Sequence, residues 1–144
     1  MSAGQSSRAP VNGSASKPEK AVVLLVDDDP AVLTSLKFAL ELEGFSVGVF
    51  QDAQSLLREH AIGRHTSLVI DYRLPGTNGI DLLQRLRARG VTAPAILITS
   101  HPSEDLRKRA AAMAIPIVEK PLLDNSLIAK LREQHGVAES RPST

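Results

Sequence analysis

The sequence predicts an α/β fold, a doubly wound sheet of five parallel strands with helices on both faces. Two observations predict it. Short apolar runs alternate five times with amphipathic stretches, which is the order of successive strand–helix units. The apolar runs also carry aliphatic residues at consecutive positions, so both faces of such a strand must be covered, as in a parallel sheet. Right-handed crossovers then distribute the helices over the two faces.

The first unit shows its strand and its helix start clearly. Ala21–Val26 is the first apolar run, and Asp29 followed by Pro30 predicts an N-cap and a first helical residue. Apolar residues at helical spacing follow. Gly44 is placed to end this helix in the left-handed conformation, and Phe45–Phe50 is expected as the second strand.

The later units repeat this pattern along the chain. The remaining elements are expected to be a helix capped by Asp52 and running to about Ala61, a strand Ser67–Asp71, a loop Tyr72–Asn78, a helix with Ile80, Leu83 and Leu86 on one face that ends at Gly90, a strand Ala95–Thr99, a helix starting at Ser103, a strand Pro116–Glu119, and a helix from Asp124 to about Gln134.

Length and composition indicate one domain between two tails. The 144 residues suit a single domain. Residues 1–20 are rich in serine, glycine and proline and nearly free of large apolar side chains, so we expect a flexible N-terminal tail. Residues 136–144 have a similar composition and are expected to form a flexible C-terminal tail. Residues 21–135 are expected to form the folded domain.

Composition also excludes several classes of function. Aromatic residues make up 3% of the chain, which argues against a stacking surface for single-stranded nucleic acid. The absence of cysteine excludes disulfides, thiolate zinc sites and a cysteine nucleophile. With 17 basic and 16 acidic residues, the chain lacks the basic field of a nucleic-acid-binding protein. No apolar run is long enough to span a membrane and no signal peptide precedes the domain, so we expect a cytoplasmic protein without a membrane partner.

Polar residues gather where the expected strands end. Asp27 and Asp28 follow the first strand, Asp71 ends the third, Thr99 ends the fourth and Lys120 follows the fifth. Because the carboxyl ends of parallel strands share one edge of the sheet, these groups are expected to converge. Crowded carboxylates without histidine or cysteine suit Mg²⁺ or Mn²⁺. A nearby ammonium and a hydroxyl suit a phosphoryl group, and a carboxylate can accept one as an acyl phosphate. Asp29 is expected to cap the helix rather than to bind metal.

Four segments carry a resemblance to a known family. They are VLLVDDDP (Val23–Pro30), LVIDYRLPGTNGIDLL (Leu68–Leu83), ILITS (Ile96–Ser100) and VEKP (Val118–Pro121). In this order, each at an expected strand end, they resemble the receiver domain of two-component response regulators over roughly Ala21–Gln134. The resemblance implies the flavodoxin-like (βα)5 receiver fold.

The resemblance also implies roles for single residues. Asp71 would accept the phosphoryl group, Asp28 would bind Mg²⁺ directly and Asp27 would hold it more loosely. The backbone carbonyl of Arg73 would be a further ligand. Thr99 would move to the attached phosphoryl group. Lys120 would pair with the phosphoryl group. The peptide bond between Lys120 and Pro121 would be cis.

The sequence departs from the family pattern at three positions. Ile117 stands where the family usually has a tyrosine or phenylalanine, so the aromatic switch of many members is missing. Arg73 and His101 occupy the two positions that tune the phosphoryl lifetime in the family. Neither provides the acid or amide that aligns an attacking water, so we expect a comparatively stable phospho-Asp71. The chain's four histidines lack ligand spacing and are expected on the surface.

The leading interpretation is therefore a signalling module and not an enzyme. It would take a phosphoryl group from a histidine kinase or a histidine phosphotransfer protein. It would then signal to a protein partner through the fourth helix, fifth strand and fifth helix, a face through which a homodimer could also form. About ten residues follow the last expected helix, so we expect no DNA-binding output domain and no direct DNA binding.

Other interpretations stay open. The chain could be a receiver fragment of a larger regulator. A Mg²⁺-dependent phosphohydrolase with an aspartyl-phosphate intermediate would use Asp27 and Asp29, but the chain leaves no room for a substrate-selecting cap domain and Asp71 would have no role. A binding module that is never phosphorylated is the third alternative.

Overall fold

The computed structural model describes residues 21–59, 62–63, 65–122 and 125–136. Five parallel strands form the sheet in the order β3-β2-β4-β7-β8, and a separate two-stranded hairpin lies beside it. In chain order the elements are β2 (Val22–Val26), α2 (Pro30–Leu42), β3 (Ser46–Phe50), α3 (Ala53–Leu57), β4 (Thr66–Asp71), β5 (Arg73–Leu74), β6 (Thr77–Asn78), α4 (Gly79–Ala88), β7 (Ala95–Thr99), α5 (Glu104–Ala112), β8 (Ile117–Glu119) and α6 (Ser126–Gln134). The predicted α/β fold is confirmed.

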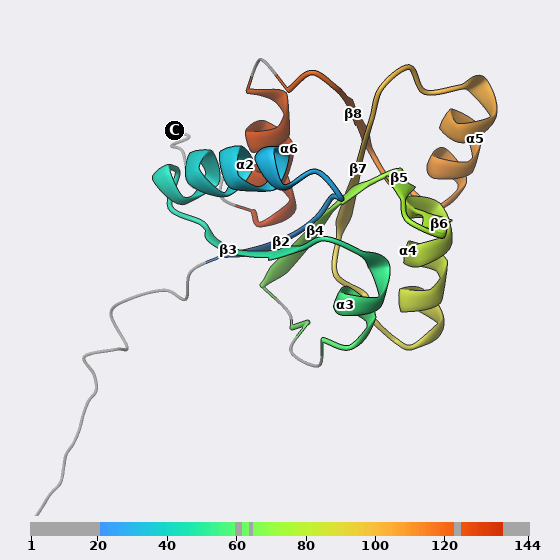
Figure 1. The fold of residues 1–144 in the computed structure, drawn as a ribbon, viewed down its shortest axis with the longest axis horizontal. Helices are drawn as coiled ribbons and strands as arrows, with labels where there is room; N and C mark the ends of the chain where they lie inside the picture. The colour runs from blue at the N-terminus through green and yellow to red at the C-terminus, as the bar shows by residue number, and fades with distance from the viewer. Residues whose placement is uncertain (1–20, 60–61, 64, 123–124, 137–144) are drawn as a thin grey trace, which may run out of the picture.

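Two helical layers cover the sheet (Figure 1). Helices α2 and α6 lie on one face, and α3, α4 and α5 lie on the other. The side chains of the strands alternate between the two cores. In β4, for example, Val69 belongs to the core under α2 and α6, whereas Leu68 and Ile70 belong to the core under α3–α5. Burial on both faces explains the continuous apolar runs in the sequence.

Helix α2 begins as the sequence predicts. The Asp29 carboxylate accepts a hydrogen bond from the backbone N–H of Ala31 at 2.9 Å, and Pro30 is the first helical residue. Helix α5 likewise begins after Ser103, whose hydroxyl oxygen accepts from the N–H of Leu106. At the other end of α2, Gly44 has a φ of 99°, the left-handed conformation expected of it.

Three local predictions need correction. Helix α3 ends at Leu57 instead of near Ala61, which lies outside the described residues. Leu56 and Leu57 are the last buried side chains of α3, and no apolar residue follows at once to hold a further turn against the core. The final helix begins at Ser126, while Asp124, the predicted start, lies outside the described residues.

The third correction concerns the segment Tyr72–Asn78, which was expected to be a loop. It contains the hairpin of β5 and β6, in which Leu74 pairs with Thr77. Pro75 and Gly76 form the turn, and Gly76 has a φ of 74°, as a turn with proline followed by a left-handed glycine requires. The buried Leu74 side chain anchors the hairpin against the core.

No helix in the described part of the chain is long and apolar enough to cross a membrane.

Candidate functional site

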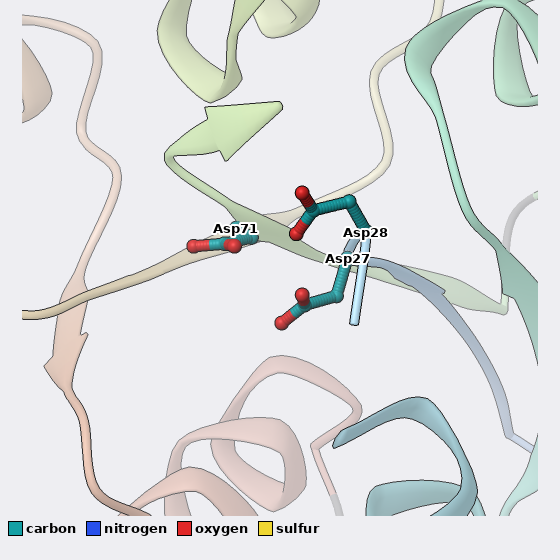
Figure 2. A group of neighbouring side chains, drawn as sticks. All are labelled: Asp27, Asp28 and Asp71. Carbon is teal, nitrogen blue, oxygen red and sulfur yellow. The ribbon is translucent and has the colours of Figure 1, made fainter. Parts of the chain in front are cut away.

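The carboxyl ends of β2 and β4 bring three carboxylates together. Asp27 and Asp28 follow β2, and Asp71 is the last residue of β4 (Figure 2). One carboxylate oxygen from each of the three lies within 4.8 Å of the others. Asp27 and Asp71 are buried, whereas Asp28 is exposed. The cluster therefore joins two groups shielded from water to one that solvent reaches.

Lys120 supplies the positive charge of this cluster. Its Nζ atom lies 3.2 Å from Oδ2 of Asp27 and 3.3 Å from Oδ2 of Asp71. The backbone N–H of Lys120 donates to the carbonyl of Thr99 at 2.8 Å, which fixes the residue beside the end of β7. The peptide bond between Lys120 and Pro121 is cis.

The environment of Asp71 sets its protonation. Burial and then the negative charge of Asp27 raise the pKa of Asp71 to about 6, against the opposing effects of Lys120 and of a hydrogen bond from the backbone of Arg73. For Lys120, burial would lower the pKa, but the attraction of Asp71 and Asp27 outweighs it and the pKa rises. The lysine is therefore an ammonium ion that faces two carboxylates.

Asp27 is held by more than the lysine. Its Oδ1 atom accepts a hydrogen bond from the N–H of Asp29 at 3.0 Å, while Oδ2 faces Lys120. The carboxylate of Asp29 caps α2, so it is not turned to the cluster. This arrangement does not favour a phosphohydrolase that works with Asp27 and Asp29.

Thr99 and Ile117 lie on β7 and β8, which follow β4 in the order of the sheet. Ile117 packs against the core under α3–α5, and Thr99 is buried, with its hydroxyl donating to the carbonyl of Ser100 at 3.3 Å. Of the expected site residues, the structure thus groups Asp27, Asp28, Asp71 and Lys120 by their side chains. Arg73 is exposed in β5 and is close to Asp71 through its backbone.

His101 is one of the residues that line a groove beside the acidic cluster, and Lys120 lines the same groove. The groove has a volume of about 640 Å³ and lies between the start of α2 and the segment Lys120–Leu122. His101 is exposed and has a φ of 47°, an uncommon conformation for a residue with a side chain.

Sequence reasoning missed the contribution of Gly79, the first residue of α4. A Cβ atom at this position would lie 2.8 Å from the backbone oxygen of Asp71 and 2.7 Å from a methyl carbon of Leu97. The absent side chain therefore lets α4 pack directly against the end of β4. The Asn78–Gly79 pair in the sequence was the available signal, because Asn78 caps α4 by accepting from the N–H of Asp81.

The histidines also differ from expectation in one case. His65 and His101 are exposed, and His60 lies outside the described residues. His135, however, is partly buried. Its Nε2 atom lies 3.0 Å from the hydroxyl oxygen of the buried Ser67 and its ring lies beside Phe45. The prediction of a surface position for His135 is wrong, because the end of α6 packs onto the start of β4.

Comparisons with known proteins agree with this architecture. Residues 23–132 match the response regulator receiver domain. The chain is 35% identical over 113 residues to the transcriptional regulatory protein FixJ of Bradyrhizobium diazoefficiens. The aligned stretch covers 78% of this chain and 55% of FixJ. The chain therefore spans about half the length of this curated relative.

Solved structures give the same result. The crystal structure of FixJ-N superposes with a TM-score of 0.71 at 30% identity, covering 83% of this chain and 96% of that one. The CheY-like receiver domain protein from Methanospirillum hungatei superposes with a TM-score of 0.72 at 25% identity, covering 85% and 98%. With the matching domain, the parallel sheet and the acidic cluster at its carboxyl edge, this chain belongs to the response regulator receiver domain family.

Proposed function

We propose that the chain is a phosphoacceptor module in which Asp71 receives the phosphoryl group. The observation that carries the proposal is the buried Asp71 carboxylate, which lies against Lys120 and within reach of two further acids. The donor would be a phosphohistidine of a histidine kinase or of a histidine phosphotransfer protein. The phosphorus–nitrogen bond of the donor breaks as a bond forms between phosphorus and a carboxylate oxygen of Asp71, which yields an acyl phosphate.

The acidic cluster fits a divalent cation of the Mg²⁺ or Mn²⁺ type. Its donors are carboxylate oxygens, and one of them, Asp28, is open to solvent, as a cation that keeps several waters requires. Asp28 and Asp71 would hold the ion, with Asp27 more loosely and the Arg73 carbonyl as a further ligand. When bound, the ion supplies positive charge that neutralises the phosphoryl oxygens.

Lys120 and Thr99 are proposed to contact the attached phosphoryl group. Lys120 is already 3.3 Å from Asp71 and needs only a small movement. The Thr99 hydroxyl, which faces the Ser100 carbonyl here, would have to turn. That turn would pull on β7 and shift the neighbouring face of α5, β8 and α6, through which we propose that the chain signals to a partner protein or a second phosphorylated copy.

Ile117 makes this response different from that of relatives with an aromatic switch. Its side chain is partly buried against the core under α3–α5, so we propose that the response is a repacking of aliphatic side chains rather than the rotation of a ring. With Arg73 and His101 at the two tuning positions, we propose a long-lived phospho-Asp71. Loss of the phosphoryl group within seconds in the purified protein would contradict this part.

The setting of the module is also a proposal. We infer that residues 21–135 form the unit and that it works in the cytoplasm. The stretches expected as tails, 1–20 and 136–144, lie outside the described residues except for Gly136. The FixJ proteins are transcriptional regulatory proteins by name, and this chain matches about half of such a relative. Output through protein contact, without DNA binding by these residues, is the function that we propose for this stretch.

Incubation with acetyl phosphate and Mg²⁺, followed by intact-mass measurement, tests the phosphoacceptor. We expect a gain of one phosphoryl group in the wild type and in Asp105→Asn, an exposed control on α5, but not in Asp71→Asn. Phosphorylation that persists in Asp71→Asn would refute the assignment. Repeated turnover of phosphomonoesters would instead indicate a phosphohydrolase, and no incorporation from any donor would indicate a binding module.

A further inference from the structure

Few side chains anchor helix α5 to the core. It has nine residues, of which Leu106 and Ala110 are buried. The neighbouring helix α4 has ten residues (Figure 1), and five of them are buried, namely Gly79, Ile80, Leu82, Leu83 and Leu86. A helix this short is marginally stable without packing. The position of α5 therefore depends more than that of α4 on contacts outside the core.

Two ion pairs join α5 to its neighbours. Nη2 of Arg107 lies 2.7 Å from Oε2 of Glu119 in β8, and both side chains are more than half exposed. Nη2 of Arg109 lies 3.4 Å from Oδ1 of Asp81 in α4. Ion pairs that solvent reaches contribute little to stability. The docking of α5 is therefore weak, and a small change in free energy is enough to shift it.

The backbone is strained at both ends of α5. His101, three residues before the helix, has a φ of 47°, and Ala114, two residues after it, has a φ of 58°. A left-handed conformation costs free energy for a residue with a Cβ atom. At the position that Ala114 occupies after α5, the helices α2, α4 and α6 are followed by left-handed glycines, which are Gly44, Gly90 and Gly136. Only α5 carries this cost among these four helices.

The strain before α5 lies next to the acceptor site. His101 precedes Pro102, and a proline favours an extended backbone in the residue before it. The Thr99 hydroxyl donates to the carbonyl of Ser100 at 3.3 Å, so the backbone just before His101 is tied to the side chain that is proposed to turn to the phosphoryl group. When Thr99 turns, this hydrogen bond breaks and the backbone of His101 is free to become extended.

We propose that strain at His101 and Ala114 holds α5 in a high-energy position, and that release of this strain favours the phosphorylated state. The inference rests on the proposed phosphoacceptor function and adds what sets the balance between its two states. As His101 relaxes, the start of α5 moves and the Arg107–Glu119 pair opens. The helix carries the movement to its other end, where Ala114 leaves the left-handed conformation.

Ala114→Gly tests the strain at the end of α5 away from the acceptor. Ala114 is exposed, so the substitution removes a methyl group in contact with solvent and leaves the acidic cluster intact. We expect the variant to be more stable than the wild type in urea, because glycine adopts the left-handed conformation without the cost. We expect acetyl phosphate with Mg²⁺ to phosphorylate it about threefold more slowly or less, because only the unphosphorylated state gains stability. A merely structural defect would lower the stability as well as the rate.

Two further variants separate strain from general stability. Gly44→Ala is the matched control, since it adds a methyl group at the same position after α2, where a Cβ atom would meet no other atom within 4 Å. It should lower stability and leave the rate of phosphorylation unchanged. Pro102→Ala should slow phosphorylation as Ala114→Gly does, because it removes the preference of His101 for an extended backbone and keeps its side chain.

Hydrogen exchange of the unphosphorylated chain gives a second measurement. Backbone amides of α5 should exchange faster than those of α4, and Ala114→Gly should slow exchange in α5 but not in α4. The inference is overturned if the wild type is phosphorylated and Ala114→Gly is phosphorylated as fast or faster. Equal protection of α5 and α4 in the wild type overturns it too. A wild type that takes up no phosphoryl group overturns the proposed function, and this inference with it.

Discussion

Nζ of Lys120 and Oδ2 of Asp71 lie 3.3 Å apart, although 49 positions separate the two residues along the chain. The same ammonium lies 3.2 Å from Asp27, so one cation balances two buried carboxylates. The balance is incomplete, because the pKa of Asp71 is still raised to about 6 by burial and by Asp27.

Asp71→Asn is expected to stabilise the metal-free protein at pH 7.5. A raised folded-state pKa means that ionisation of Asp71 costs folding free energy, and this cost appears as the pH rises from 3.8 through about 6. After allowance for solvent screening, we expect a gain of about 1–2 kcal/mol. Urea denaturation in chelator measures it. The difference from the wild type should shrink toward pH 4, and a constant difference would contradict the argument.

Removal of the cation should have the opposite effect. Lys120→Met leaves Asp27 and Asp71 facing each other without a counter-charge. We expect a loss of about 1–3 kcal/mol in the metal-free protein at pH 7.5, less than for a fully buried pair because Lys120 is partly exposed. In a double-mutant cycle, Asp71→Asn should recover much of this loss. Additive effects of the two substitutions would show that the charges do not interact.

Mg²⁺ should stabilise the folded chain through Asp28. Above the dissociation constant, each tenfold rise in free Mg²⁺ should add about 1.4 kcal/mol to the free energy of unfolding. Asp28→Asn should reduce this response strongly. Asp29→Asn is the matched control, since it removes the same charge while asparagine keeps the helix cap. Equal Mg²⁺ responses in the two variants would exclude Asp28 as a ligand.

Gly79→Ala should loosen the support of the acceptor. The added methyl group would lie 2.8 Å from the backbone oxygen of Asp71, so α4 or the end of β4 must move. We expect destabilisation by about 1–3 kcal/mol and slower phosphorylation by acetyl phosphate. Gly63→Ala is the control, because a Cβ atom there meets no atom within 4 Å. Equal thermal stability of the two variants would refute the steric argument.

His135 should make stability depend on pH. Burial and then the nearby His65 lower the pKa of His135 below 6.5. The unfolded chain therefore binds a proton more readily than the folded one, and stability is lost as the pH falls below 6.5. We expect the wild type to lose more stability than His135→Gln between pH 7.5 and pH 5.5 in urea titrations. Parallel losses would show that His135 titrates as it does in the unfolded chain.

Local signals predicted most of the elements because they act within a few residues. Asp29 and Pro30 start α2, Ser103 caps α5, and the apolar run Ala95–Thr99 is the strand β7. The end of α3 was predicted less well. Its length depends on which side chains find a core to pack against, and helical spacing alone does not reveal this.

The site residues show the same contrast between what local sequence predicts and what depends on tertiary packing. The sequence was enough to predict that acids, a hydroxyl and a lysine lie at one edge of the sheet, because each of them ends or follows a strand and parallel strands have their carboxyl ends at the same edge. Only the folded structure shows that Lys120 faces Asp27 and Asp71 while the Thr99 hydroxyl donates to the carbonyl of Ser100. Strand register and side-chain burial decide which of these polar groups contact each other, and both depend on contacts between residues far apart in the chain.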